Sequence, residues 1–72
     1  MMNKLTTSEL EFIISRVLDN AKDSALIKDN SEFAHGKRLA YYEILDTIKN
    51  ELEVRDIDIK GFGLDISLEN LL

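Results

Sequence analysis

The sequence contains no cysteine, no proline and no tryptophan, and His35 is its only histidine. The absence of cysteine excludes disulfide bonds and most structural zinc sites, and a single histidine cannot form a histidine metal cluster. Without proline, nothing in the chain forces a helix to kink. A domain of 72 residues usually needs a disulfide, a metal or a partner chain to be stable. Association with another chain is therefore the expected source of stability.

Long apolar runs and an excess of positive charge are also missing. The apolar runs fall far short of the roughly 20 residues that a membrane-spanning helix needs, and residues 1–5 lack the apolar core of a signal peptide. The 14 acidic residues outnumber the 9 basic ones, which gives a net charge of −5. Because nonspecific nucleic-acid binding depends on clustered Lys and Arg, this balance disfavours it. We expect a cytoplasmic protein without a membrane or nucleic-acid partner.

Helical periodicity predicts a first helix at about residues 7–28. Thr6 can cap this helix, and Glu9, three residues later, completes a capping box; Ser8 with Glu11 offers the same box two residues later. Apolar residues then recur at helical spacing over an arc of roughly 140°. They are Leu10, Ile13, Ile14, Val17, Leu18, Ala21 and Ala25. This pattern is typical of a helix that buries one face.

A second helix is predicted at about residues 32–54, after a break at residues 29–31 in which either Asp29 with Glu32, or Ser31 alone, can act as the cap. The short connection favours an antiparallel hairpin. The inner face of this helix approaches an arc of roughly 180°, which is wider than one neighbouring helix covers. Its residues are Phe33, Gly36, Ala40, Tyr41, Ile44, Leu45, Ile48 and Leu52.

The excess width of this face predicts that a second chain packs on it. We expect Ile44 and Ile48 to face the first helix, and Tyr41, Leu45 and Leu52 to face the second chain. The predicted oligomer interface consists of Tyr41, Leu45, Ile48 and Leu52.

Gly36 is unusual because glycine inside a helix costs roughly 1 kcal/mol relative to alanine. In an antiparallel hairpin it would lie opposite Ser24 and Ala25, where small residues on both helices allow a close approach. On this hypothesis a leucine at position 36 would overpack the crossing and destabilise the fold by about 1–3 kcal/mol.

Residues 55–72 have a different pattern, in which turn residues alternate with apolar ones. Asp58 can cap one turn that Gly63 ends, and Ser67 can cap a last turn at residues 68–72. The segment contains too many apolar residues to remain a free tail. We expect it to cover the open end of the bundle.

Residues 56–67 partly match a calcium-binding EF-hand loop. Asp56 and Asp58 fall at ligand positions, but Lys60 places an ammonium where a ligand oxygen belongs. Ser67 also stands where the loop requires a bidentate glutamate. We predict that this segment does not bind calcium.

No other group of residues carries a convincing chemical signature. The basic segment at residues 35–38 lacks the upstream glycine and the following Ser or Thr of a phosphate-binding loop. Glu51 is an acidic residue on the apolar side of its helix, and pairing with Arg55 four positions later explains it. We therefore predict no enzyme activity and no catalytic, cofactor-binding or metal-binding residue.

Three apolar residues lie outside both apolar stripes, namely Phe12, Leu39 and Tyr42. They form a candidate partner surface for an unidentified protein. Ordinary exposure of single apolar residues is an equal alternative.

The segment Gly36-Lys37-Arg38-Leu39-Ala40-Tyr41-Tyr42-Glu43-Ile44-Leu45, with Ile57-Asp58-Ile59 and Gly63-Leu64-Asp65 after it, resembles a group of short, uncharacterised bacterial proteins. The resemblance covers the last half of the chain. It implies a helical hairpin, and no catalytic motif comes with it.

The sequence as a whole predicts one all-α domain over residues 1–72. Its architecture is an antiparallel two-helix hairpin with short C-terminal turns, which dimerises into a four-helix bundle. The predicted function is a non-enzymatic, homo-oligomeric interaction module. The alternative is a small acidic regulator, of the antitoxin, immunity or anti-repressor type, that masks a basic partner protein.

Overall fold

The computed structural model describes residues 4–72. It contains two long helices, α1 (Thr7–Leu26) and α2 (Glu32–Val54), followed by two short 3-10 helices, η1 (Ile59–Phe62) and η2 (Leu68–Leu71). Residues 4–72 include no strand. The predicted all-α class and the helical hairpin are confirmed, with α1 ending two residues earlier than expected. Part of the segment that we examined for a signal peptide, residues 1–3, lies outside the described residues.

The start of α1 is fixed by the predicted capping box. The backbone N–H of Glu9 donates to Thr6 Oγ1 at 3.1 Å, and the backbone N–H of Thr6 donates to Glu9 Oε1 at 2.9 Å. The hydrogen bond from the backbone N–H of Thr6 lowers the pKa of Glu9 because it favours the carboxylate, and the Thr6 side chain lowers this pKa further. The capping box is therefore confirmed in both directions.

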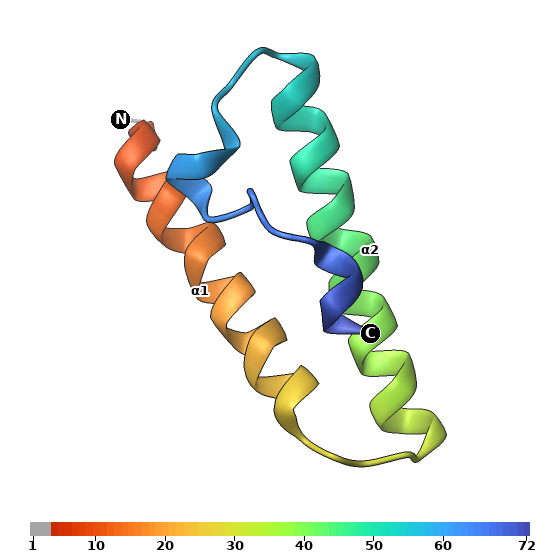
Figure 1. Ribbon diagram of the computed structural model, residues 1–72. Helices are drawn as coiled ribbons and strands as arrows, with labels where there is room; N and C mark the ends of the chain where they lie inside the picture. The colour runs from red at the N-terminus through yellow and green to blue at the C-terminus, as the bar shows by residue number, and fades with distance from the viewer. Residues whose placement is uncertain (1–3) are drawn as a thin grey trace.

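The turn between the helices uses polar side chains in the same way. Ser31 caps α2, because its Oγ accepts from the backbone N–H of Ala34 at 3.1 Å. The Asp29 carboxylate accepts from the backbone N–H of Ser31 at 2.9 Å, and this hydrogen bond lowers the pKa of Asp29. Arg38 Nη1 donates to the carbonyl oxygen of Asp29 at 3.2 Å, which ties α2 to the turn. The two helices run antiparallel (Figure 1).

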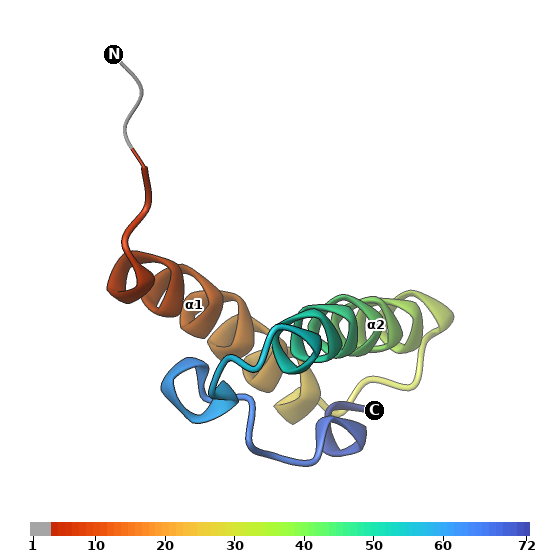
Figure 2. The ribbon, with the colours of Figure 1, turned by 90° about the horizontal axis from the view of Figure 1, so that it is seen from above.

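The C-terminal segment, residues 55–72, lies along one face of the hairpin. Its chain crosses from the end of α2 to α1, forms η1 there, and returns to α2 with η2 (Figure 1). Viewed from above, the whole segment lies on the same side of the two helices (Figure 2). The segment thus covers a face of the hairpin. It is not confined to the open end, which is where the sequence analysis placed it.

Local capping shapes this segment. Asp58 Oδ1 accepts from the backbone N–H of Lys60 at 3.0 Å, and Gly63 ends η1 in the left-handed region at a φ of +76°. The predicted first turn is therefore confirmed. The last turn also forms, but Ser67 makes no side-chain cap, because its hydroxyl donates to Glu69 Oε2 at 2.8 Å.

The hydrophobic core forms where α1, α2 and the C-terminal segment meet. Phe62, Leu45 and Leu64 are its largest fully buried side chains. The buried apolar residues are Ile14, Leu18, Ala21, Leu45, Leu52, Phe62, Leu64, Leu68 and Leu71. Four of these nine belong to the C-terminal segment, so this segment is an integral layer of the fold.

The core changes the interpretation of the wide apolar face on α2. Leu45 is 0% exposed and Leu52 is 8% exposed within the single chain, whereas Ile44 is 53% exposed. The C-terminal segment and α1 enclose Leu45, so it offers no surface to a second chain. This corrects the assignment of Leu45 to an oligomer interface. Ile44 was predicted to face the first helix and Leu45 to face a second chain, but Leu45 is the residue that is buried within the chain and Ile44 is the one that is exposed.

Gly36 does not lie at a close helix crossing. A Cβ atom at this position would have no neighbour within 4 Å. Gly36 precedes Leu45 by nine residues, which places it about 180° around α2 from the buried side. The predicted contact with Ser24 and Ala25 is wrong because the prediction turned the side of α2 that carries Gly36 toward α1, whereas the side that carries Leu45 is buried.

The end of α2 contains the one non-glycine residue with positive φ among residues 4–72, Asp56 at +57°. The backbone N–H of Ile57 donates to the Leu52 carbonyl, and that of Asp56 donates to the Glu53 carbonyl, both at 3.0 Å. This pattern closes helices and usually places glycine where Asp56 stands.

Substitution of Asp56 by glycine is expected to stabilise the fold by about 1 kcal/mol, because glycine adopts the left-handed conformation without strain. Urea denaturation followed by circular dichroism measures the change. Asp58→Gly is the matched control and should destabilise, because it removes the η1 cap. A lower midpoint for Asp56→Gly would show that the carboxylate matters more than the backbone conformation.

Candidate protein interface

Two adjoining hollows lie on α1 and α2. The first, of about 290 Å³, lies between the helices and is lined by Leu10, Ile14, Thr47, Ile48, Glu51, Leu52 and Arg55. The second, of about 320 Å³, is lined by Glu43, Ile44, Thr47 and Ile48. The two share Thr47 and Ile48, and no residue after Arg55 lines either. These linings place both hollows on the side of the hairpin away from η1 and η2. We call this side, which the C-terminal segment leaves uncovered in Figure 2, the open face.

Apolar side chains dominate the open face. Ile44 is 53% exposed, and Ile48 is half-buried beside it. On α1, the half-buried Leu10 lines the first hollow, whereas Ile13, which is 46% exposed, lines a separate hollow together with Phe12. Single exposed apolar residues are normal, but neighbouring ones on two helices mark an interaction surface.

The predicted interface residues divide between the open face and the core. Ile48 lines both hollows, and Tyr41 is half-buried and packs against the core. Leu45 and Leu52 are buried, with Leu52 at the floor of the first hollow. Of the four, Ile48 thus lies on the open face, Leu52 reaches it with its small exposed part, and Leu45 does not.

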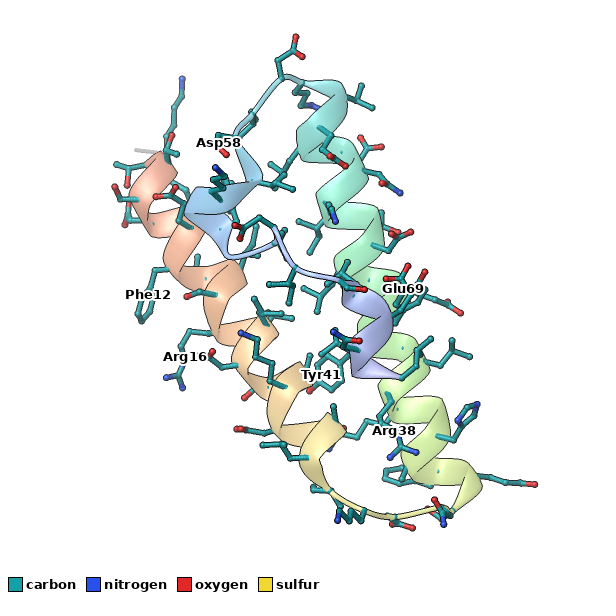
Figure 3. The ribbon with its side chains drawn as sticks, viewed as in Figure 1. Phe12, Arg16, Arg38, Tyr41, Asp58 and Glu69 are labelled. Atoms are coloured by element: carbon teal, nitrogen blue, oxygen red, sulfur yellow. The ribbon has the colours of Figure 1, made fainter. Side chains whose placement is uncertain are left out.

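The structure does not bring Phe12, Leu39 and Tyr42 together. Phe12 is 65% exposed and points away from the hairpin on the outer side of α1 (Figure 3). Leu39 lies on the other helix, about 120° around α2 from Leu45. Tyr42 is half-buried and packs against the core. The three residues therefore form no common surface.

Tyr42 lies in a negative electrostatic environment. The carboxylate of Glu69 on η2, and then that of Asp46 on α2, raise the pKa of Tyr42 because they disfavour the phenolate. The pKa of Glu69 is itself lowered, mainly by the hydrogen bond from Ser67 Oγ. Two carboxylates thus make the surroundings of this tyrosine negative.

Glu51 and Arg55 form the pair that the sequence suggested. Arg55 Nη1 lies 2.7 Å from Glu51 Oε1 and also donates to the Glu51 carbonyl oxygen at 2.9 Å. Both side chains are largely exposed. An exposed pair of this spacing contributes about 0.3–0.5 kcal/mol, so its main effect is to place charge at one end of the open face.

The third hollow of interest, of about 420 Å³, lies between α1 and η2. It is lined by Lys22, Ala25, Leu26, Ile66, Ser67, Asn70 and Leu71. Its three polar residues are exposed at the surface, and none is aimed from the interior at a ligand. This arrangement does not define a ligand class.

Within residues 4–72, no group of three or more His, Cys, Asp or Glu side chains could hold a metal ion. Asp56 and Asp58 instead shape the end of α2 and the start of η1. Residues 4–72 also include no helix with the length and apolar content needed to cross a membrane.

Titration calorimetry at millimolar calcium is expected to show no saturable heat. Lys60 and Ser67 break the ligand set of the EF-hand pattern, and the Asp58 side chain already accepts a backbone hydrogen bond. A dissociation constant in the low micromolar range would contradict this prediction.

Comparison of the chain with protein-family models, with curated proteins and with solved structures found no match. The resemblance to short bacterial hairpin proteins therefore stays a prediction.

Proposed function

We propose that the protein is a non-enzymatic interaction module that associates with itself through the open face. The observation that carries this proposal is the 53% exposure of Ile44 next to Ile48 and two adjoining hollows. Burial of an exposed isoleucine side chain contributes roughly 1.5–3 kcal/mol. A four-helix bundle forms when two open faces meet, because each supplies two antiparallel helices.

The dimensions of the open face suit a stable dimer. α2 contains 23 residues, so it extends for about 35 Å at roughly 1.5 Å per residue. Two helices side by side, each about 10 Å wide, present a face of roughly 700 Å². A stable interface buries about 800 Å² on each partner, which is close to this value.

Ile44→Asp is expected to convert the protein to a monomer while its helical circular dichroism is retained. The side chain lies outside the core, so the substitution places a charge in the interface and not in the interior. Sedimentation velocity at micromolar concentration measures the change.

Leu39→Asp is the matched control, because Leu39 is 38% exposed on α2 and lies away from both hollows. It should sediment like the parent. If Ile44→Asp also sediments like the parent, the open face is not the interface.

A second candidate function is a small acidic regulator that masks a basic partner protein. Glu69 and Asp46 favour it, because they make the surface beside Tyr42 negative. Affinity capture from the lysate of the source organism should then retain a basic protein at low salt and release it at high salt. The Asp46→Asn, Glu69→Gln double variant should lose that protein, and equal capture by parent and variant would contradict the role of these carboxylates.

A further inference from the structure

We propose that the occupant of the open face is a second copy of this chain whose α2 crosses α2 antiparallel, with a two-fold axis at Ile44. This inference rests on the proposed self-association and specifies its geometry. It predicts which residues meet across the interface and in which register.

The first support is a continuous strip of side chains along α2. They recur every three or four residues, so at about 100° per residue they point within a sector of roughly 80°. The strip consists of Phe33, Lys37, Ala40, Ile44, Ile48 and Glu51. Five of its members are exposed and Ile48 is half-buried, and Phe33 is 81% exposed. The strip shares Ile44, Ile48 and Glu51 with the linings of the hollows.

The second support is that this strip is complementary to itself about Ile44. In a two-fold interface, residues equally far before and after the axis meet. Ala40 precedes Ile44 by four residues and Ile48 follows it by four, so a small side chain meets a large one. At the axis, Ile44 meets its own copy. The apolar centre therefore fills without two bulky side chains colliding on either side of the axis.

The charges of the strip follow the same relation. Lys37 precedes Ile44 by seven residues and Glu51 follows it by seven, each about 10.5 Å from the axis along the helix. An antiparallel crossing brings Lys37 to the partner's Glu51 on both sides of the axis. A parallel crossing would bring lysine to lysine and glutamate to glutamate, which is repulsive.

Phe33 at the start of the strip and Arg55, the C-cap of α2 just beyond its end, follow the same relation. Phe33 precedes Ile44 by eleven residues and Arg55 follows it by eleven. The antiparallel crossing therefore brings the exposed ring of Phe33 to the partner's Arg55, which lines the first hollow. A guanidinium and an aromatic ring attract each other when they are in contact. The ring of Phe33 would also place an apolar group in the partner's first hollow. This contact gives a reason for an aromatic side chain that is 81% exposed in the single chain.

Charge exchange tests the register. Lys37→Glu should place like charges at both symmetric contacts and raise the dimer dissociation constant by about 10-fold or more. Glu51→Lys should do the same, and the double variant should return to within about 3-fold of the parent, because the pair is restored in reverse. Lys28→Glu and Glu53→Lys are charge-matched controls at exposed positions off the strip, and each should stay within about 3-fold of the parent. Sedimentation equilibrium measures all six proteins.

A second measurement uses the absence of cysteine in the chain. Ile44→Cys places two thiols at the two-fold axis, where they should form a disulfide-linked dimer on mild oxidation. Leu39→Cys, away from the strip, should remain largely unlinked. Equal cross-linking of the two variants would overturn the register.

The outcomes separate the geometry from the proposed function. If the parent associates but Lys37→Glu has no effect, or the double variant is not rescued, the antiparallel register is wrong while self-association stands. If the parent is a folded monomer, both are wrong. Rescue of the double variant together with selective linkage of Ile44→Cys supports the register.

Discussion

Phe62→Ala is expected to unfold most of the protein at room temperature. Phe62 is 2% exposed and lies in the core that the C-terminal segment shares with α1 and α2. Truncation of a buried phenylalanine to alanine costs about 3–5 kcal/mol through lost burial and the cavity that remains. A single core in a chain this small supplies only about 3–5 kcal/mol. Circular dichroism at 222 nm, with urea titration, measures the loss.

Phe12→Ala is the matched control for this experiment, since it removes the same side chain at a position that is 65% exposed. Its urea midpoint should stay near that of the parent. A well-folded Phe62→Ala protein would show that the C-terminal segment is dispensable. The hairpin would then have to be covered in another way, and a second chain would again be the source of burial for Leu45.

Leu45→Asp is the second substitution with a large expected effect, and it should unfold the chain at every concentration. Leu45 is 0% exposed, and a carboxylate there would have no partner. A buried, unpaired charge costs several kcal/mol, which is comparable to the whole stability of the fold. Thermal denaturation followed by circular dichroism should show no cooperative transition.

The neighbouring substitution Ile44→Asp provides the contrast. It should leave the monomer folded, because Ile44 lies on the open face and not in the core. Two adjacent residues thus separate folding from association. If Leu45→Asp yields a folded monomer, Leu45 belongs to an interface and not to the core.

The sequence predicted the local structure because local structure depends on near neighbours. Thr6 with Glu9, Ser31, and Asp58 with Gly63 are capping signals that span a few residues, and all of them form. Helical periodicity located both helices to within about two residues. These features do not depend on which distant segments meet.

The orientation of α2 could not be predicted in the same way. Its apolar arc is wide, and periodicity gives the width of an arc but not the element that covers each part. The C-terminal segment decides the matter, because it encloses Leu45 and leaves Ile44 exposed. Its buried residues sit at irregular spacing around 3-10 turns, so the sequence indicated that it is apolar but not which face it covers. The error at Gly36 has the same cause.

The candidate interface was identified only in part for this reason. Self-association was predicted from the excess of apolar surface, and Ile48 was assigned to the interface. The strip from Phe33 to Glu51 was present in the sequence as a set of spacings, but its apolar residues were assigned to the inner face of α2, with Ile44 toward the first helix, and Glu51 was assigned to a pair with Arg55. The strip can be recognised once the buried side of α2 is known, because its residues form an exposed row next to the buried Leu45 and Leu52.

Sedimentation equilibrium of the unsubstituted chain, over a range of micromolar concentrations, tests the central claim most directly. The claim is that one chain folds by itself around the C-terminal segment and then pairs through the open face. It predicts a mass that rises with concentration from 8.2 kDa toward twice that value, with helical circular dichroism that does not change. A constant mass of 8.2 kDa for the helical protein across that range would contradict it.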